Sequence, residues 1–118
     1  MAVSGGAAIG YASARRHRTG RACRFLVEDA VYVAYDAHGM GVGRALLTEL
    51  IKLCEGSKFR QMVAVMAGEN LSSVRLHERL GFRQMGRVEG FAFKHGRWVD
   101  SLLMQRSLGE GTSSSPRD

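Results

Sequence analysis

Three glycines stand at alternate positions between an apolar, strand-like run and a helix-forming run of residues. They are Gly39, Gly41 and Gly43. Glycine lets the backbone turn sharply there, places no side chain between its amides and an anion, and leaves the partial positive charge of the next helix N-terminus accessible. The spacing predicts a backbone cradle for phosphate or pyrophosphate, although a turn that only tightens strand-to-helix packing is the alternative. Arg44 replaces the third glycine of a GxGxxG loop, which disfavours a dinucleotide site of that type.

Two further side chains have the chemistry to move protons. Glu28 stands in an apolar, strand-like run just before the loop, where a carboxylate serves either as a base or as an ordinary strand side chain. His77 stands in a helix-like run, where a lone histidine is usually structural. The two cysteines, Cys23 and Cys54, are far apart and lack CxxC spacing, so we expect free thiols and no metal site. Neither cysteine has a suitable base beside it in the sequence, so we expect no covalent acyl intermediate.

The elements that must position these residues follow from apolar periodicity and from the turn residues. The pattern predicts strands over residues 7–13, 25–34, 61–67, 82–93 and 98–108, and helices over residues 44–55 and 71–80. A strand, a helix and a strand in succession imply one right-handed parallel crossover, and a turn at His95-Gly96 implies an antiparallel closing hairpin. The predicted fold class is α+β, with a mixed, mostly antiparallel sheet.

Length and charge narrow the class of protein further. The 118 residues suit one domain, which we assign to residues 1–108, with a disordered Gly, Ser and Thr-rich tail over residues 109–118. Of the formal net charge of +6, five arginines between positions 15 and 24 carry +5. That segment is either a solvated loop or a phosphate-binding patch. A basic nucleic-acid-binding module is a remote alternative, because aromatic residues are not interleaved with the arginines.

The chain also carries few targeting signals. No apolar run approaches the length of a membrane span, and the first residues lack the pattern of a signal peptide. A transit peptide is the alternative, because no acidic residue precedes Glu28. We therefore predict a cytoplasmic protein with no membrane partner and no nucleic-acid partner.

Several motifs together resemble a known family. HGMGVGRALL at residues 38–47, after the strand VEDAVYV at residues 27–33, resembles the acetyl-CoA signature of the GCN5-related N-acetyltransferases (GNAT). NLSSVRLHERLGF at residues 70–82 resembles the later helix of that family and its Gly-Phe exit. With FKHGRWVD at residues 93–100, these blocks are similar to the phosphinothricin N-acetyltransferase branch. The resemblance covers residues 9–108 and implies the acyl-CoA N-acyltransferase fold.

The resemblance implies acetyl-CoA as cosubstrate, with no metal. The backbone of Val31, Tyr32 and Val33 would pair with the pantetheine arm, and the amide of Val33 would also donate to the thioester oxyanion. Asn70, at a helix start, would bond the pantetheine end of the cofactor. The pyrophosphate would be held by the amides of Gly39, Met40, Gly41, Val42, Gly43 and Arg44.

The same resemblance assigns the proton transfers. Glu28 would accept a proton from the attacking amine, directly or through water. His77 stands where most family members carry a tyrosine acid, and it would protonate the departing thiolate. The implied function is acetyl transfer to the primary amine of a small amino-acid-like compound, of the phosphinothricin or methionine sulfone type, by direct attack.

Two departures from the family pattern limit this transfer. His38 and Met40 replace residues that often contact phosphate, so lower cofactor affinity is expected. The family also normally begins with a strand, two helices and a strand, roughly fifty residues, before the strand at residues 7–13. We therefore expect an N-terminally truncated fold with an exposed strand edge, which either is covered by a homodimer partner or promotes aggregation. A non-catalytic acetyl-CoA-binding remnant is the main alternative.

Overall fold

The chain forms a mixed β-sheet covered by two helices. The computed structural model describes residues 2–4, 7–16, 20–33 and 41–116. Its elements within this part of the chain are β1 (Ala2–Ser4), β2 (Ala7–Arg16), the short 3-10 helix η1 (Arg21–Cys23), β3 (Leu26–Val33), α1 (Val42–Glu55), β4 (Gln61–Ala67), α2 (Leu71–Arg79), β5 (Arg83–Lys94) and β6 (Arg97–Ser107).

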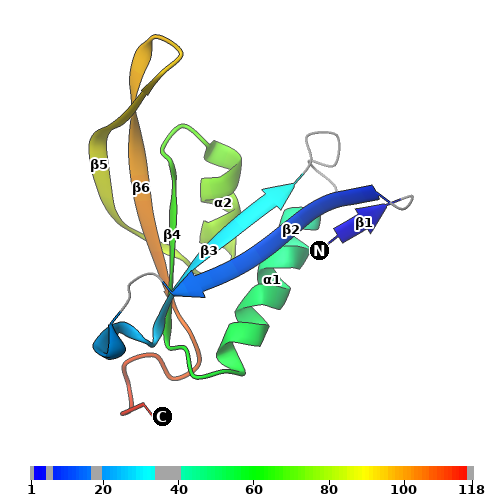
Figure 1. Cartoon of the computed structure of the whole chain (residues 1–118), viewed down its shortest axis with the longest axis vertical. Coiled ribbons are helices and arrows are strands. Elements are labelled where there is room, and N and C mark those ends of the chain that lie inside the picture. Colours follow the sequence, from blue (N-terminus) through cyan, green and yellow to red (C-terminus); the bar gives the residue numbers. More distant parts are fainter. Residues whose placement is uncertain (1, 5–6, 17–19, 34–40, 117–118) are drawn as a thin grey trace.

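The sheet has the topology that the sequence predicted. The described strands lie in the order β1-β2-β3-β4-β6-β5. β3 and β4 are parallel and are joined through α1, and the other neighbouring strands are antiparallel. Figure 1 shows α1 and α2 behind the sheet, on the same face. The predicted mixed, mostly antiparallel sheet with one crossover is confirmed.

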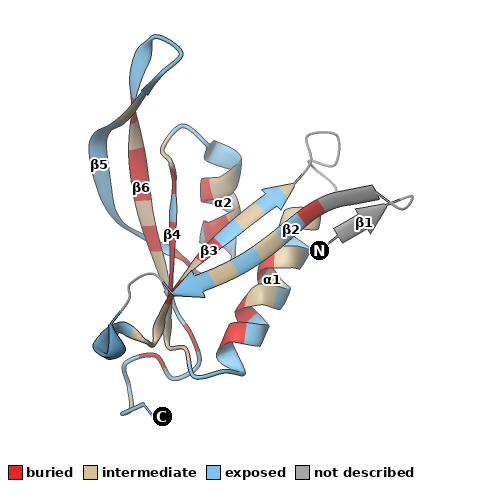
Figure 2. Ribbon diagram, in the orientation of Figure 1, coloured by how far each residue is buried: buried red, intermediate tan, exposed pale blue. Residues whose placement is uncertain are grey.

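The core lies between this face of the sheet and the helices. Because side chains alternate along a strand, the core residues of β4 and β6 stand at every second position, at Met62, Ala64 and Met66 and at Leu102 and Met104, and Figure 2 shows buried residues on both strands. They pack against the inner faces of α1 and α2. The buried cluster is Val27, Leu47, Ile51, Cys54, Met62, Ala64, Met66, Val74, Phe82, Leu102, Met104 and Leu108.

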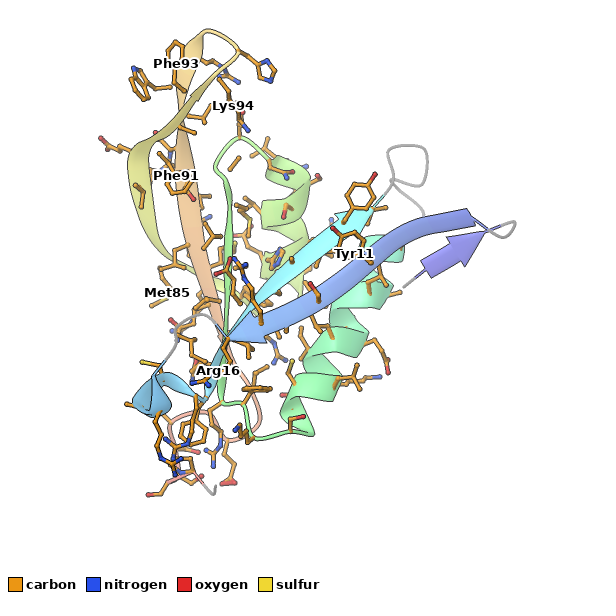
Figure 3. All side chains as sticks on the ribbon, viewed as in Figure 1. Tyr11, Arg16, Met85, Phe91, Phe93 and Lys94 are labelled. Carbon is orange, nitrogen blue, oxygen red and sulfur yellow. The ribbon has the colours of Figure 1, made fainter. Side chains whose placement is uncertain are left out.

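The opposite face of the sheet is the more exposed one in the described part of the chain at β2 and the second half of β3, whereas Val63 and Ser101 on that face are buried. Tyr11 and Tyr32 stack on it with ring centroids 5.5 Å apart, and both side chains are about half exposed. The β5–β6 hairpin extends beyond the helices (Figure 1) and carries exposed aromatic side chains of its own, among them Phe91 and Phe93 (Figure 3), whose relative exposures are 63% and 59%. The sheet therefore has one helix-covered face and one uncovered face.

Two segments differ from their predicted structure. β2 runs to Arg16 rather than ending at Ser13, because its arginines continue the antiparallel ladder, with Arg15 opposite Glu28. β1 was not predicted, because three small residues carry little strand signal. Residues 109–118 were predicted to be a disordered tail. In residues 109–116 the structure describes no helix or strand, and Arg60 Nη1 donates to the carbonyl oxygen of Gly111 at 2.8 Å and to that of Ser114 at 3.3 Å.

Leu47 and Leu53 provide a test of this packing on one helix. Leu47 is fully buried, whereas the exposure of Leu53 is 64%. Leu47→Ala should lower the free energy of unfolding by about 2 to 5 kcal/mol, because it leaves a cavity. Leu53→Ala should change it by less than about 0.5 kcal/mol. Urea unfolding of both variants measures the difference, and equal losses would contradict the assigned core face.

Candidate functional site

The site begins where two parallel strands separate. β3 and β4 pair only from Leu26 opposite Gln61 to Glu28 opposite Val63. Beyond that point β3 stays paired with β2 as far as Val33, while β4 stays paired with β6 through Ala67. Figure 1 shows the two strands diverging, with α2 behind the gap. The divergence takes the second half of β3 out of the β4 ladder and opens the sheet.

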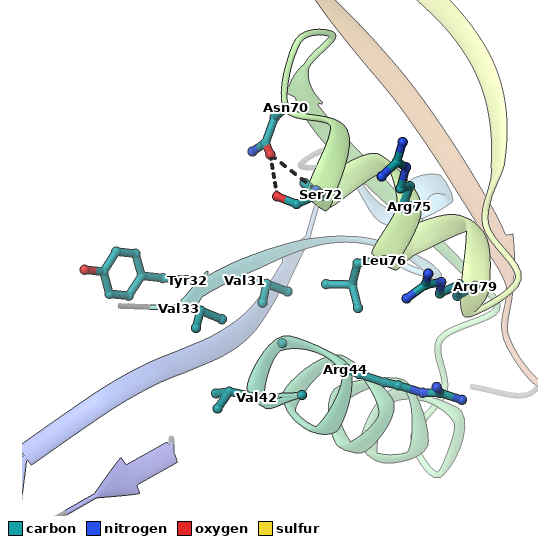
Figure 4. A pocket seen from close by; sticks show the side chains of 13 residues that line it. Val31, Tyr32, Val33, Val42, Arg44, Asn70, Ser72, Arg75, Leu76 and Arg79 are labelled. Atoms are coloured by element: carbon teal, nitrogen blue, oxygen red, sulfur yellow. Dashed lines mark hydrogen bonds between the residues drawn. The ribbon is translucent and has the colours of Figure 1, made fainter. Parts of the chain in front are cut away.

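A cleft of about 690 Å³ lies on the helix side of this opening. Figure 4 shows its walls, which are the end of β3, the first turn of α1 and the exposed face of α2. Its lining is apolar near β3 and cationic along α2. The lining residues are Val31, Tyr32, Val33, Gly41, Val42, Gly43, Arg44, Asn70, Ser72, Ser73, Arg75, Leu76 and Arg79.

The structure describes two of the three loop glycines, Gly41 and Gly43, and each position favours glycine for a different physical reason. Gly41 is the N-cap of α1 with a left-handed φ of 76°, a conformation that disfavours other residues. A Cβ at Gly43 would lie 3.3 Å from Leu76 Cδ2 and 3.5 Å from Val33 Cγ2, so this glycine also permits close packing. The first turn of α1 contains no acidic residue. Its amides therefore border the cleft with no carboxylate of that turn beside them.

Asn70 is the N-cap of α2, as the sequence predicted. Its Oδ1 accepts from the backbone N–H of Ser73 at 3.3 Å and from the Ser72 hydroxyl at 3.1 Å. This is the usual arrangement of an N-cap. The cap uses Oδ1, so the Nδ2 group is the part of the side chain left to donate to a ligand in the cleft.

Glu28 lies at the point where β3 and β4 separate. It is the last β3 residue paired with β4, and it alternates with Val27 and Asp29, which face the helices. Its carboxylate therefore belongs to the uncovered face. The Glu28 side chain is 20% exposed, and Arg15 Nη2 lies 3.9 Å from its Oε2. Glu28 does not line the cleft on the helix side, but it stands at the edge of the same opening.

His77 is buried beneath the cleft and bonded on both sides. Its Nδ1 lies 2.8 Å from the carbonyl oxygen of Ser73, and its Nε2 lies 3.1 Å from each carboxylate oxygen of Asp29. The His77 and Asp29 side chains are 3% and 4% exposed. Both partners of the ring are acceptors, so a charged imidazolium, which donates from both nitrogens, fits this pocket. Asp29 and His77 thereby tie the middle of β3 to α2.

The bonding partners of His77 also set its pKa. Burial by itself lowers that pKa, but the hydrogen bond to Asp29, the negative charge of Asp29 and the Ser73 carbonyl together outweigh it. The net result is a pKa raised above the ordinary value of 6.5. The fold therefore favours the protonated ring.

The cysteines offer no nucleophile at the cleft. Burial raises the pKa of the Cys54 thiol, and the nearby charge of Asp29 raises it further. A protonated, buried thiol is a poor nucleophile. Cys23 is exposed on η1, which lies outside the cleft lining.

The structure brings most of the sequence-predicted cofactor residues together. One cleft is lined by residues 31–33, residues 41–44 and Asn70. Gly39 and Met40 lie outside the described residues. Glu28 lies at the sheet opening and His77 beneath the cleft, so neither lines it.

Sequence reasoning did not single out Asp29, Arg75 or Arg79. The signal for Asp29 was a charge at the same parity as Val27 and Val31, on the buried side of β3. The signal for the arginines was their spacing of four residues, which places both on one face of α2. Neither signal indicates a contact or a site until the positions of β3 and α2 relative to each other are known.

The described residues hold neither a metal-ligand cluster nor a membrane-spanning helix. Within residues 2–4, 7–16, 20–33 and 41–116, no group of three or more His, Cys, Asp or Glu side chains could hold a metal ion. None of the helices described in the same ranges is long and apolar enough to cross a membrane.

Comparison with known proteins identifies the family. The model of the acetyltransferase (GNAT) family matches residues 1–82. The chain is 45% identical over 117 residues to a phosphinothricin N-acetyltransferase of Alcaligenes faecalis. It is 39% identical over 111 residues to an L-methionine sulfoximine/L-methionine sulfone acetyltransferase of Pseudomonas aeruginosa. The chain therefore belongs to the GNAT family and is related to its phosphinothricin acetyltransferase-like members.

A solved structure supports the same fold. The crystal structure of a GNAT phosphinothricin acetyltransferase from Sinorhizobium meliloti, in complex with acetyl-CoA, aligns with a TM-score of 0.91 and 50% sequence identity. The alignment covers 96% of this chain and 61% of that one. The matches to the Alcaligenes and Pseudomonas proteins cover 98% and 94% of this chain but 59% and 64% of theirs. The chain thus spans about three fifths of the length of these relatives.

The Asp29–His77 pair predicts how stability depends on pH. A pKa that is higher in the folded chain means that the fold binds the proton more tightly, so protonation of His77 stabilises it. This contribution is complete below the unfolded pKa of about 6.5 and is lost as pH rises through the raised folded pKa. Asp29→Asn should lower the free energy of unfolding by up to about 3 kcal/mol near pH 6, and by less near pH 9.

Urea unfolding of both proteins between pH 5.5 and 9 measures this difference. His95→Asn is the matched control, because His95 is an exposed turn residue at φ 55°, a conformation that asparagine tolerates. The control should keep the wild-type profile. Parallel profiles for wild type and Asp29→Asn would contradict a raised His77 pKa that depends on this carboxylate.

Proposed function

We propose that the chain is an acetyl-CoA-dependent N-acetyltransferase for the primary amine of a small amino-acid-like compound, of the phosphinothricin or methionine sulfone type. One observation carries the proposal. The cleft on the helix side is lined by the β3 and α1 residues whose motifs indicated acetyl-CoA. The names of the related proteins support the class of substrate.

The cleft has the chemistry that an acetyl-CoA molecule needs. Val31, Val33 and Leu76 give it an apolar wall beside an extended backbone, which suits the pantetheine arm. The first amides of α1, after the left-handed Gly41, suit the pyrophosphate. In this proposal Gly39 and Met40 extend the same set of amides. Bound there, acetyl-CoA supplies an acetyl group activated as a thioester.

The sheet opening separates two approaches to the reacting carbon. The cofactor side is the helix-covered face, while Glu28 stands on the uncovered face at the edge of the opening. A primary amine approaching from the uncovered face meets a carboxylate that accepts its proton, directly or through water. The amine nitrogen bonds to the thioester carbon, the Val33 amide donates to the oxyanion, and the carbon–sulfur bond then breaks.

His77 remains in the proposal as the proton source for the departing thiolate. Its charged ring holds a proton on each nitrogen, but both protons are bonded within the fold. Donation therefore requires one of these hydrogen bonds to break. Asp29 then favours reprotonation of the ring. We also include a homodimer in the proposal. The predicted open edge beside residues 7–13 is occupied by β1, and the opposite edge strand, β5, is exposed at nearly every residue in the described structure.

Calorimetric titration with acetyl-CoA, followed by an assay of CoA-thiol release, tests the proposal. We expect binding, and thiol release when phosphinothricin or methionine sulfone is added. Absence of detectable binding would refute the proposed function. Binding without thiol release from any amine offered would instead establish the non-catalytic remnant.

Glu28→Gln tests the proposed base. Turnover should fall by about 10²- to 10⁴-fold, the usual contribution of a positioned base, while the acetyl-CoA dissociation constant stays near the wild-type value. Glu89→Gln is the matched control, because Glu89 is an exposed carboxylate on the edge strand β5. Equal turnover of Glu28→Gln and the control would remove Glu28 from the mechanism.

A further inference from the structure

Three arginines line the cleft, and they come from two helices. Arg44 lies in the first turn of α1, and Arg75 and Arg79 lie four residues apart on α2. All three side chains are exposed. Figure 4 shows Arg75 and Arg79 on α2 and Arg44 along α1, all on the side of the view away from Tyr32, with the Arg75 side chain pointing away from α1. The cleft therefore has an apolar end at β3 and a cationic end between the helices.

These arginines lack the neutralising partners that other arginines have. In the described part of the chain, no carboxylate lies within ion-pair distance of Arg44, Arg75 or Arg79. Each of four other arginines lies within 4.0 Å of a carboxylate, namely Arg15, Arg87, Arg97 and Arg106. Like charges gathered at one cleft repel one another, and a bound anion removes that cost.

A guanidinium group donates parallel hydrogen bonds that match the oxygens of a phosphate. Its positive charge favours the phosphate that carries the largest negative charge. The pyrophosphate already has the first amides of α1 in the proposed function. The first amides of α2 are less available, because Asn70 caps the N–H of Ser73. A phosphomonoester dianion has the largest charge and three terminal oxygens, which several guanidinium groups satisfy together.

We propose that Arg75 and Arg79 bind the 3′-phosphomonoester on the ribose of CoA. This inference rests on the proposed function and adds a site that discriminates among nucleotides. The apolar end holds the pantetheine arm and the α1 amides hold the pyrophosphate. The cationic end then binds the one phosphate that distinguishes CoA from 3′-dephospho-CoA.

Calorimetric titration with CoA and with 3′-dephospho-CoA tests the site. Wild type should bind CoA about 10- to 100-fold more tightly, the range expected of one or two charge-assisted hydrogen bonds. The double variant Arg75→Gln/Arg79→Gln should lose most of this preference by weakening CoA binding alone. Arg83→Gln, which removes an exposed charge on β5 outside the cleft, should keep the wild-type preference. Thermal unfolding of each variant establishes that it is folded.

The outcomes separate this inference from the proposed function. Equal wild-type affinities for the two nucleotides would overturn the 3′-phosphate site and leave acetyl-CoA binding intact. A double variant that weakens both nucleotides by the same factor would also overturn it, because the arginines would then act on a shared phosphate. Failure of wild type to bind either nucleotide would refute the proposed function itself.

Discussion

The buried bond between Asp29 and His77 governs how the two halves of the domain meet. Glu28 is the last residue of β3 paired with β4, and Asp29 is the next residue along the strand. From Asp29 onward β3 is no longer paired with β4. Its contact on that side is with α2, because both carboxylate oxygens of Asp29 lie within hydrogen-bond distance of the His77 ring. His77 in turn bonds the Ser73 carbonyl, on the turn of α2 that lines the cleft. Breaking one partner of a buried pair leaves the other charge uncompensated, so this contact fixes the helix beside the opening.

That arrangement gives the opening two chemically distinct sides. The helix side has an apolar wall, helix amides and three arginines, whereas the open side has Glu28 and the stacked pair Tyr11 and Tyr32. In the proposed reaction the thioester enters from one side and the amine from the other. The buried Cys54, whose pKa is raised by burial, agrees with direct transfer rather than an acyl-enzyme.

Local signals in the sequence predicted most elements, while contacts between distant residues were not predictable. β4 was predicted at its observed bounds because polar residues flank its apolar run, and Asn70 and Gly81 mark the ends of α2. The Asp29–His77 bond joins positions 48 residues apart, and no local pattern reports such a pair. The hydrogen bonds from Arg60 to Gly111 and Ser114 also join distant positions. The motifs located residues that line one cleft, but the cationic part of that cleft became visible only with α1 and α2 placed beside it.

Amide hydrogen exchange with and without acetyl-CoA tests the central claim most directly, namely that the cleft opened by the separation of β3 and β4 holds the cofactor. Ligand should slow exchange at residues 30–33 of β3, where the pantetheine arm would pair with the backbone, and at residues 42–44 of α1. Exchange along the β5–β6 hairpin should stay unchanged at the same ligand concentration. Tight binding without protection of residues 30–33, or with protection confined to the hairpin, would contradict the account.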